Sequence, residues 1–156
     1  MYFEIELLRA MIKALPDPVF VITESGHYLE IAGGKDPAYY HDGFGHSAGD
    51  KVLCRLTKDC AKQLRQADSL YRIGGEEFAV LLPETNAENA CQQAERLRQV
   101  SEQLRIDLRQ SAGQISISVG VSEFADADTS IEDVMKRADA RLYEAKRNGR
   151  NRVVGG

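Results

Sequence analysis

The chain has 156 residues, of which 43% are hydrophobic and 28% charged, and its formal net charge is −4. This length allows one domain, or one domain plus a fragment of another, and the composition is that of an ordinary globular protein. The net negative charge excludes a general attraction to nucleic acid, and no apolar run approaches the roughly 18 residues of a transmembrane helix.

The N-terminal part of the chain contains a predicted helix and a predicted hairpin. Apolar residues follow helical spacing over 3–15, where a Pro-x-Pro sequence ends the helix. Two apolar runs, 19–23 and 28–32, are separated by a Glu-Ser-Gly turn, which predicts a β-hairpin. A loop rich in glycine and aspartate follows at 33–45, and we expect the boundary between two parts of the chain there.

The cysteines and the first residues indicate the cellular compartment. The three cysteines have no CxxC spacing and fall in predicted helices, so we interpret them as buried thiols of a reducing cytoplasm. The N-terminus lacks the basic start and the cleavage site of a signal peptide. We therefore expect a cytoplasmic protein without a membrane segment.

Helical and strand patterns alternate in the rest of the chain. Apolar residues recur at helical spacing over 48–65, and they alternate with small polar residues over 115–121, as in a half-buried strand. A short strand is expected over 152–154. These elements predict an α+β fold, with an antiparallel-rich sheet flanked by helices. Two further helices open with predicted capping boxes, Thr85 with Glu88 and Thr129 with Glu132.

An acidic hairpin is the most informative segment. A predicted strand ends at Gly74 and Gly75, the carboxylates of Glu76 and Glu77 follow, and an apolar strand resumes at Phe78. Two residues without a Cβ let a phosphate chain lie against the backbone, and carboxylates beside them can hold Mg²⁺ over it. Taken alone, these five residues are also compatible with a solvated turn.

Four segments then occur in order at characteristic spacings. They are 44–50, 65–68, 74–78 and 138–153. Together they resemble the GGDEF family of diguanylate cyclases, and the resemblance covers residues 44–154. It implies a palm-like α+β fold related to nucleotide cyclases. It also implies a reaction in which two GTP molecules are condensed into cyclic di-GMP, with Mg²⁺ or Mn²⁺, across a symmetric homodimer.

The resemblance assigns roles to individual residues. Glu76 and Glu77 match the catalytic carboxylates, and Glu76 is the implied metal ligand. Two cations four residues apart match the phosphate-binding positions, although cations at a helix end also stabilise the helix dipole. The implied substrate-binding residues are Asp50 and His41 for guanine, Gly74 and Gly75 beside the nucleotide, and Lys146 and Arg150 for the phosphates.

Arg65 and Asp68 match the RxxD site at which cyclic di-GMP inhibits members of this family. An arginine can stack on guanine and pair with phosphate, and an aspartate can accept hydrogen bonds from the base edge. The plainer alternative is an ordinary polar helix end. The position upstream of Gly74 favours the inhibitory site.

The chain departs from the family pattern in the segment before residue 44. Gly33 and Lys35 stand where the family has the two acids of its first metal-binding strand, and His41 replaces the guanine-binding asparagine. Two functions therefore remain open. One is a diguanylate cyclase with impaired activity, and the other is a catalytically defective domain that binds cyclic di-GMP or GTP as a regulatory module.

Residues 9–32 resemble the opening of a PAS sensor domain. We therefore expect two parts, a PAS-like helix and hairpin fragment over 1–43 and an N-terminally truncated GGDEF domain over 44–156. Loss of the family's first strand would leave unpaired backbone groups inside the sheet. We expect residues 28–32 to take the place of that strand.

Overall fold

The structure is a computed structural model, and side chains are described over 54–70, 78–105 and 115–156. The predicted helix over 3–15 lies outside the described residues. The backbone is described over 18–24, 29–31, 46–74, 77–108 and 111–156.

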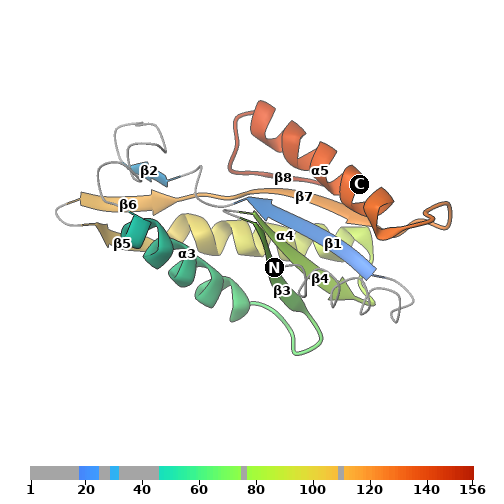
Figure 1. Ribbon diagram of the computed structural model, residues 1–156, viewed down its shortest axis with the longest axis horizontal. Helices are drawn as coiled ribbons and strands as arrows, with labels where there is room; N and C mark the ends of the chain where they lie inside the picture. The colour runs from blue at the N-terminus through green and yellow to red at the C-terminus, as the bar shows by residue number, and fades with distance from the viewer. Residues whose placement is uncertain (1–17, 25–28, 32–45, 75–76, 109–110) are drawn as a thin grey trace.

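Two sheets form the centre of the described structure (Figure 1). All strand pairs are antiparallel except one at the edge of the larger sheet, where the last two strands in its order are parallel. The larger sheet has the order β3 (Ser69–Gly74), β4 (Glu77–Pro83), β1 (Pro18–Glu24), β7 (Ser118–Glu123), β8 (Val153–Val154). The smaller has the order β2 (Leu29–Ile31), β6 (Ser111–Ile115), β5 (Arg105–Leu108).

The central strand of the larger sheet is β1, which pairs with β4 on one side and β7 on the other. Strand β2 pairs with β6 in the smaller sheet. The predicted hairpin between 19–23 and 28–32 is therefore wrong, and so is the expectation that 28–32 occupies the central position. A short apolar run suits a strand in either sheet, and only the long-range register selects its partner.

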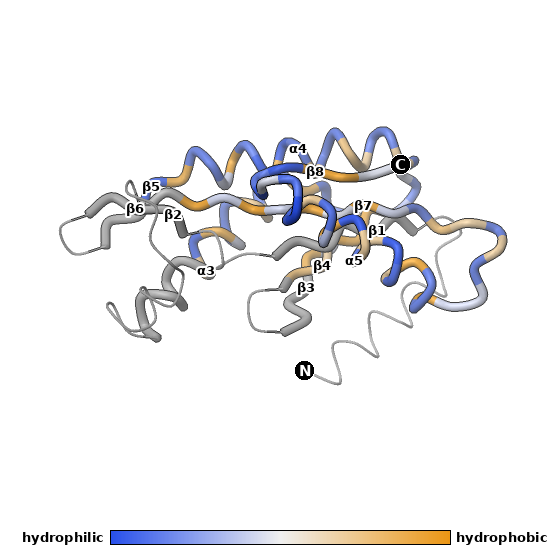
Figure 2. Tube along the Cα trace, turned by 90° about the horizontal axis from the view of Figure 1, so that it is seen from above, coloured by the Kyte–Doolittle hydropathy of each residue, from blue (hydrophilic) through white to orange (hydrophobic). Residues whose placement is uncertain are grey.

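Three described helices cover the larger sheet. Helix α3 (His46–Ala61) and helix α4 (Ala87–Gln103) pack together on one face, and helix α5 (Ile131–Arg147) covers the other (Figure 1). Along α4 and α5, hydrophobic and hydrophilic residues alternate with the helical turns (Figure 2). None of the helices in the described part is both long and apolar enough to cross a membrane. The predicted α+β arrangement of helices on a sheet is confirmed.

Strand β7 is buried on both faces, which corrects the prediction of a half-buried strand. Val119 and Val121 belong to the core on the α4 side and are fully buried. On the opposite face, just beyond the predicted alternation, Ser122 is fully buried, and its hydroxyl donates a hydrogen bond to the Val134 carbonyl oxygen of α5 at 2.8 Å. Gly120 and Ser122 therefore face helix α5, and Ser118 faces the turn after it, instead of solvent.

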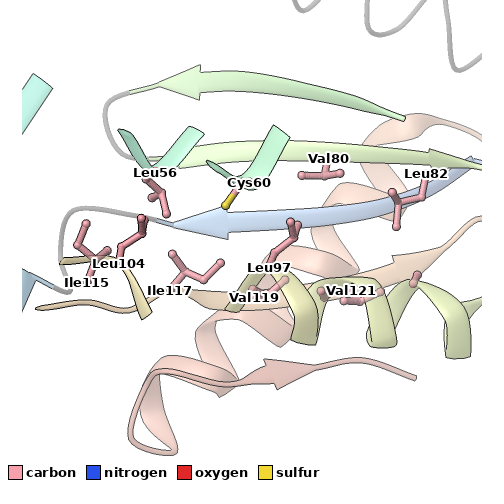
Figure 3. Close-up of a cluster of buried hydrophobic side chains, with 12 residues drawn as sticks. Leu56, Cys60, Val80, Leu82, Leu97, Leu104, Ile115, Ile117, Val119 and Val121 are labelled. Atoms are coloured by element: carbon pink, nitrogen blue, oxygen red, sulfur yellow. The ribbon is translucent and has the colours of Figure 1, made fainter. Parts of the chain in front are cut away.

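The main hydrophobic core lies between the sheets and the α3–α4 pair (Figure 3). At its centre the Cys60 thiol of α3 lies 3.7 Å from the Ser101 hydroxyl of α4, and burial raises the pKa of this thiol. Of the three thiols predicted to be buried only Cys60 is so, since Cys54 is exposed and Cys91 half-buried. Other core residues are Leu56, Val80, Leu82, Leu97, Leu104, Ile115 and Ile117.

The N-caps of α4 and α5 both lie one residue later than the sequence predicts. The N-cap of α4 is Asn86, whose side-chain oxygen accepts a hydrogen bond from the Asn89 backbone at 2.9 Å. The N-cap of α5 is Ser130, and its backbone N–H donates to the Asp133 carboxylate at 3.2 Å. Several adjacent residues could act as caps in each segment, and packing of the following helix selects one. The capping boxes predicted for Thr85 with Glu88 and for Thr129 with Glu132 are therefore wrong.

The loop between β7 and α5 is fixed by an ion pair. Arg137 of α5 donates to both carboxylate oxygens of Asp128, at 2.5 and 2.6 Å, and also to the Glu123 carbonyl oxygen at 2.8 Å. The Asp128 carboxylate also accepts from the Ala125 backbone N–H at 2.6 Å. The pKa of the Asp128 carboxyl is lowered from 3.8 to about 2, mainly by the hydrogen bonds from Arg137.

Substitution Gly120→Ala should destabilise the fold by roughly 1–3 kcal/mol, because the added methyl would overpack the α5–β7 contact. A Cβ at Gly120 would collide with the Ala138 carbonyl oxygen and lie 2.5 Å from the Leu142 backbone nitrogen. The control is Gly156→Ala, whose Cβ would meet nothing closer than 3.7 Å. Thermal and denaturant unfolding measure the effect, and equal stability of the two variants would contradict it.

Acidification should remove the Asp128–Arg137 contribution to stability within a defined pH range. Because the folded pKa of the Asp128 carboxyl lies below its ordinary value, this contribution is fully present above pH 3.8 and is lost as the pH falls toward about 2. The unfolding free energy of Asp128→Asn should therefore fall less steeply over this range than that of the unsubstituted chain. The exposed Asp126 provides the control, Asp126→Asn, whose profile should match the unsubstituted chain.

Candidate functional site

The glycine–acid hairpin lies at one end of the larger sheet. Gly74 at the end of β3 pairs with Glu77 at the start of β4, after a register irregularity that follows Arg72. Gly75 and Glu76 connect these two residues and lie outside the described part of the chain. The hairpin predicted around the acidic residues is confirmed by the antiparallel pairing of β3 with β4 as far as Gly74 and Glu77.

A row of paired residues leads from this hairpin across the sheet. Glu77 of β4 pairs with Glu24 of β1, and Glu24 pairs with Ser118 of β7. Neighbouring strands are about 4.8 Å apart, so the Glu77 and Ser118 backbones are roughly 10 Å from one another. Ser118 therefore marks the position on β7 that lies level with the acidic hairpin.

The end of α5 turns sharply through three residues with positive φ. These are Gly149 at 111°, Arg150 at 63° and Asn151 at 48°. The turn is tied back to α5, because the Arg150 backbone N–H donates to the Ala145 carbonyl oxygen at 3.0 Å. Left-handed backbone costs a residue with a side chain roughly 1–2 kcal/mol, less for asparagine, so other contacts must stabilise this turn.

One of these contacts joins the turn to the row of paired residues. The Asn151 backbone N–H donates to the Ser118 hydroxyl at 3.2 Å. The next residue, Arg152, accepts a hydrogen bond at its carbonyl oxygen from the Val119 backbone at 2.9 Å, which begins the pairing of β8 with β7. The structure therefore brings the basic turn and the acidic hairpin to the same end of the sheet.

Of the two predicted phosphate-binding cations, one precedes this turn and the other lies within it. Lys146 is half-buried in the last turn of α5, and Arg150 is exposed. Burial, and secondly the positive charge of Arg150, lower the pKa of the Lys146 ammonium. The two cations are therefore close enough to repel one another, and an anion bound between them would relieve this repulsion.

The predicted guanine-binding residues are placed less completely. Asp50 lies in the first turns of α3, with its backbone described and its side chain outside the described part. His41, together with Gly33 and Lys35 of the altered metal strand, lies outside the described residues. The roles of all these residues stay predictions.

Glu24 belongs to this end of the sheet and was missed by the sequence analysis. It was assigned to a turn, whereas it is the last residue of the central strand β1 and pairs with Glu77. No local signal in the sequence identifies it, because its position follows from a pairing between residues more than fifty positions apart. It adds a second carboxylate-bearing residue to the described end of the sheet, opposite Glu77.

Arg65 and Asp68 form a separate site beyond the end of α3. The Asp68 side chain is 1% exposed and accepts from the Arg65 guanidinium at 2.9 Å and from the Arg65 backbone at 2.7 Å. The guanidinium, whose side chain is 59% exposed, also donates to the Thr85 hydroxyl at 2.7 Å. Together with Asn89 and Gln93 of α4, these residues line a cavity of about 200 Å³.

This cavity lies far from the acidic hairpin. Arg65 donates to the carbonyl oxygen of Pro83 at 3.2 Å, and Pro83 is the last residue of β4. Glu77 begins the same strand, and a strand of this length spans roughly 20 Å. The RxxD residues and the acidic hairpin are therefore at opposite ends of β4.

The sequence matches the family described as "Diguanylate cyclase, GGDEF domain" over residues 38–152. It is 44% identical over 113 residues to diguanylate cyclase DgcP of Pseudomonas aeruginosa, a match that covers 72% of this chain and 17% of that protein. It is 42% identical over 114 residues to diguanylate cyclase A of Treponema denticola, covering 73% and 31%. The chain belongs to the GGDEF family, and it spans less than a third of these two relatives.

Solved structures of GGDEF domains resemble the whole described fold. The GGDEF domain of DgcB from Caulobacter crescentus, in complex with c-di-GMP, has a TM-score of 0.81 at 29% identity, covering 97% of this chain and 86% of that one. The active GGEEF domain of a diguanylate cyclase from Vibrio cholerae has a TM-score of 0.75 at 31% identity, covering 94% and 86%. The predicted GGDEF fold is confirmed, whereas a PAS-like origin of 9–32 and a division at residue 43 stay predictions.

Proposed function

We propose that this chain is a diguanylate cyclase domain that binds GTP with Mg²⁺ or Mn²⁺ and condenses two GTP molecules into cyclic di-GMP. The observation that carries the proposal is the meeting of the glycine–acid hairpin and the Lys146–Arg150 turn at one end of the sheet. A polyphosphate needs positive charge along its length and carboxylates that hold a divalent cation beside it. The Lys146–Arg150 turn would supply the positive charge, and the glycine–acid hairpin would supply the carboxylates.

The reaction follows from these groups. The 3′-hydroxyl oxygen of one GTP attacks the α-phosphorus of the other, a new P–O bond forms, and the bond to the β-phosphate breaks, releasing pyrophosphate. A second, reciprocal attack closes the ring. The carboxylate of Glu76 accepts the hydroxyl proton, while Lys146 and Arg150 hold the leaving phosphates. Gly74 and Gly75 leave space for the nucleotide against the backbone, and Asp50 accepts hydrogen bonds from guanine.

The carboxylates suit the proposed cation. Mg²⁺ prefers hard oxygen ligands and supplies neutralisation of phosphate charge when bound. Glu76 is the proposed ligand, with Glu77 beside it and Glu24 paired with Glu77 at the end of the central strand. Among the described side chains no group of three or more His, Cys, Asp or Glu residues could hold a metal, and the side chains of Glu24, Glu76 and Glu77 lie outside that part of the chain.

The proposed reaction requires two subunits, because each GTP must present its hydroxyl to the other across a symmetric interface. We therefore propose a homodimer as the active form. Since GTP is a nucleotide of the cell interior, the proposed location is the cytoplasm. The proposal involves no nucleic acid, and it calls for no membrane-spanning helix in the described part of the chain.

A second function, binding of cyclic di-GMP, is supported by the cavity at Arg65 and Asp68. The buried Asp68 carboxylate fixes the Arg65 guanidinium on one side, so the exposed remainder can stack on a guanine and pair with a phosphate. The cavity gives such a ligand a preformed site far from the acidic hairpin. A chain that has lost cyclase activity would retain this binding function.

Purified chain incubated with GTP and Mg²⁺ should form cyclic di-GMP and pyrophosphate, and Glu76→Gln should lower kcat by about a hundredfold or more, as expected when a metal-binding carboxylate is removed. The matched control is Glu88→Gln, which removes an exposed carboxylate from α4. Chromatography that separates linear from cyclic dinucleotides measures the product. Equal turnover by Glu76→Gln and by the control would contradict the assignment, and no product from the unsubstituted dimer would contradict the cyclase function.

Cyclic di-GMP should bind the chain, and Arg65→Ala should weaken binding by about 10- to 100-fold, the effect of losing hydrogen bonds to a charged group. Arg55→Ala is the matched control, because Arg55 is 57% exposed and also pairs with an aspartate, at 2.8 Å. Isothermal titration calorimetry gives both affinities. An equal effect of the two substitutions would show that the ligand binds elsewhere or responds only to net charge.

A further inference from the structure

Helix α4 holds the side chain of Asn151 from two sides. Arg98 donates to the Asn151 amide oxygen at 2.8 Å, and the Asn151 amide nitrogen donates to the Glu102 carboxylate at 2.7 Å. The amide thus bridges a cation and an anion, and only this orientation satisfies both partners. Because the backbone nitrogen of Asn151 also donates to Ser118, the residue is fixed to α4 and to β7 at once.

The two partners on α4 are themselves held in place. Arg98 is 15% exposed and donates to the Glu95 carboxylate at 2.7 Å and to the Glu102 carboxylate at 3.0 Å. The hydrogen bond from Asn151, followed by that from Arg98, lowers the pKa of the Glu102 carboxyl. Asn151 is therefore attached to a preorganised group of charges on a helix of 17 residues.

This attachment determines the position of Arg150. Arg150 and Asn151 are consecutive residues in left-handed backbone, so fixing Asn151 also fixes the direction in which the chain passes through Arg150. On its other side, Arg150 is tied to α5 through the Ala145 carbonyl oxygen. The spacing between Arg150 and Lys146 therefore depends on a contact with α4 as well as on the end of α5.

We propose that Asn151, held between Arg98 and Glu102, is a positioning residue that orients Arg150 with Lys146 toward the phosphates of bound GTP. The inference rests on the proposed function. Asn151 itself does not touch the nucleotide, and its effect is transmitted through the backbone of the neighbouring residue.

The test exchanges the two hydrogen-bonding partners. Asn151→Gly keeps a residue that accepts positive φ but removes the amide, and Asn151→Asp places a second carboxylate against Glu102. The double variant Asn151→Asp with Glu102→Gln restores one donor and one acceptor with the direction of the bond reversed. Glu88→Gln is the matched control, because it removes an exposed carboxylate from the first turn of the same helix.

Each protein is titrated with the α,β-methylene analogue of GTP and Mg²⁺, at a temperature where thermal unfolding shows that it is folded. Both single substitutions at Asn151 should weaken binding by about tenfold, while the double variant and Glu88→Gln stay within about threefold of the unsubstituted chain, as expected for coupled neighbours. A purely structural role would lower the unfolding midpoint and leave the affinity unchanged.

The outcomes separate the inference from the function on which it rests. Binding by the unsubstituted chain with unchanged affinity in Asn151→Gly and Asn151→Asp overturns the inference alone. A double variant as weak as Asn151→Asp also overturns it, because the restored hydrogen bond then has no effect. Absence of binding by the unsubstituted chain overturns the proposed function and the inference together.

Discussion

The close contact between α5 and β7 is the constraint on which the rest of the structure depends. Gly120 lets the backbone of α5 lie directly on the strand, and the Ser122 hydroxyl fixes an earlier turn of the helix at Val134. These two contacts set α5 antiparallel to β7. The end of α5 consequently reaches the start of β7, where the turn at Gly149–Asn151 meets Ser118 and the chain continues as β8. A bulkier residue in the middle of β7 would displace the basic turn as well as the helix.

Much of the fold could be predicted from the sequence because its signals are local. The hairpin around Gly74 and Glu77, helices α3 and α5 and the short strand at Val153 follow from spacing over a few residues, although α3 ends at Ala61 and not at residue 65. The central strand could not be predicted in this way. Pro18–Glu24 and Leu29–Ile31 are both short apolar runs, and their assignment to different sheets depends on pairing with strands far along the chain. The serines of β7 suggested a solvent-exposed face for a similar reason, because the local sequence does not show that other elements cover them.

The residues of the candidate site fall into the same two groups, those recognised from local sequence and those placed by contacts between distant segments. Lys146 and Arg150 were predicted from their separation and from the family resemblance, but α5 ends at Arg147, so the turn after the helix and not a further helical turn places Arg150. Glu24 and Asn151 were not identified as part of this site, because one is placed by strand register and the other by side chains of α4. Residues that match a family motif are therefore recognisable from sequence, whereas those that hold the motif in place depend on packing that is specific to the folded chain.

Helix α4 connects the two sites of the molecule. Asn89 and Gln93 line the cavity with Arg65 and Asp68, and Arg98 and Glu102 further along the helix hold the basic turn at Asn151. Gln93 and Glu102 are separated by roughly 14 Å of helix, a rigid distance on the scale of the domain. Coupling between two ligands requires an element whose position affects the affinity for both, and distance alone does not provide it. Helix α4 meets this structural requirement, because it carries contacts both to the cavity at Arg65 and to the turn that contains Arg150.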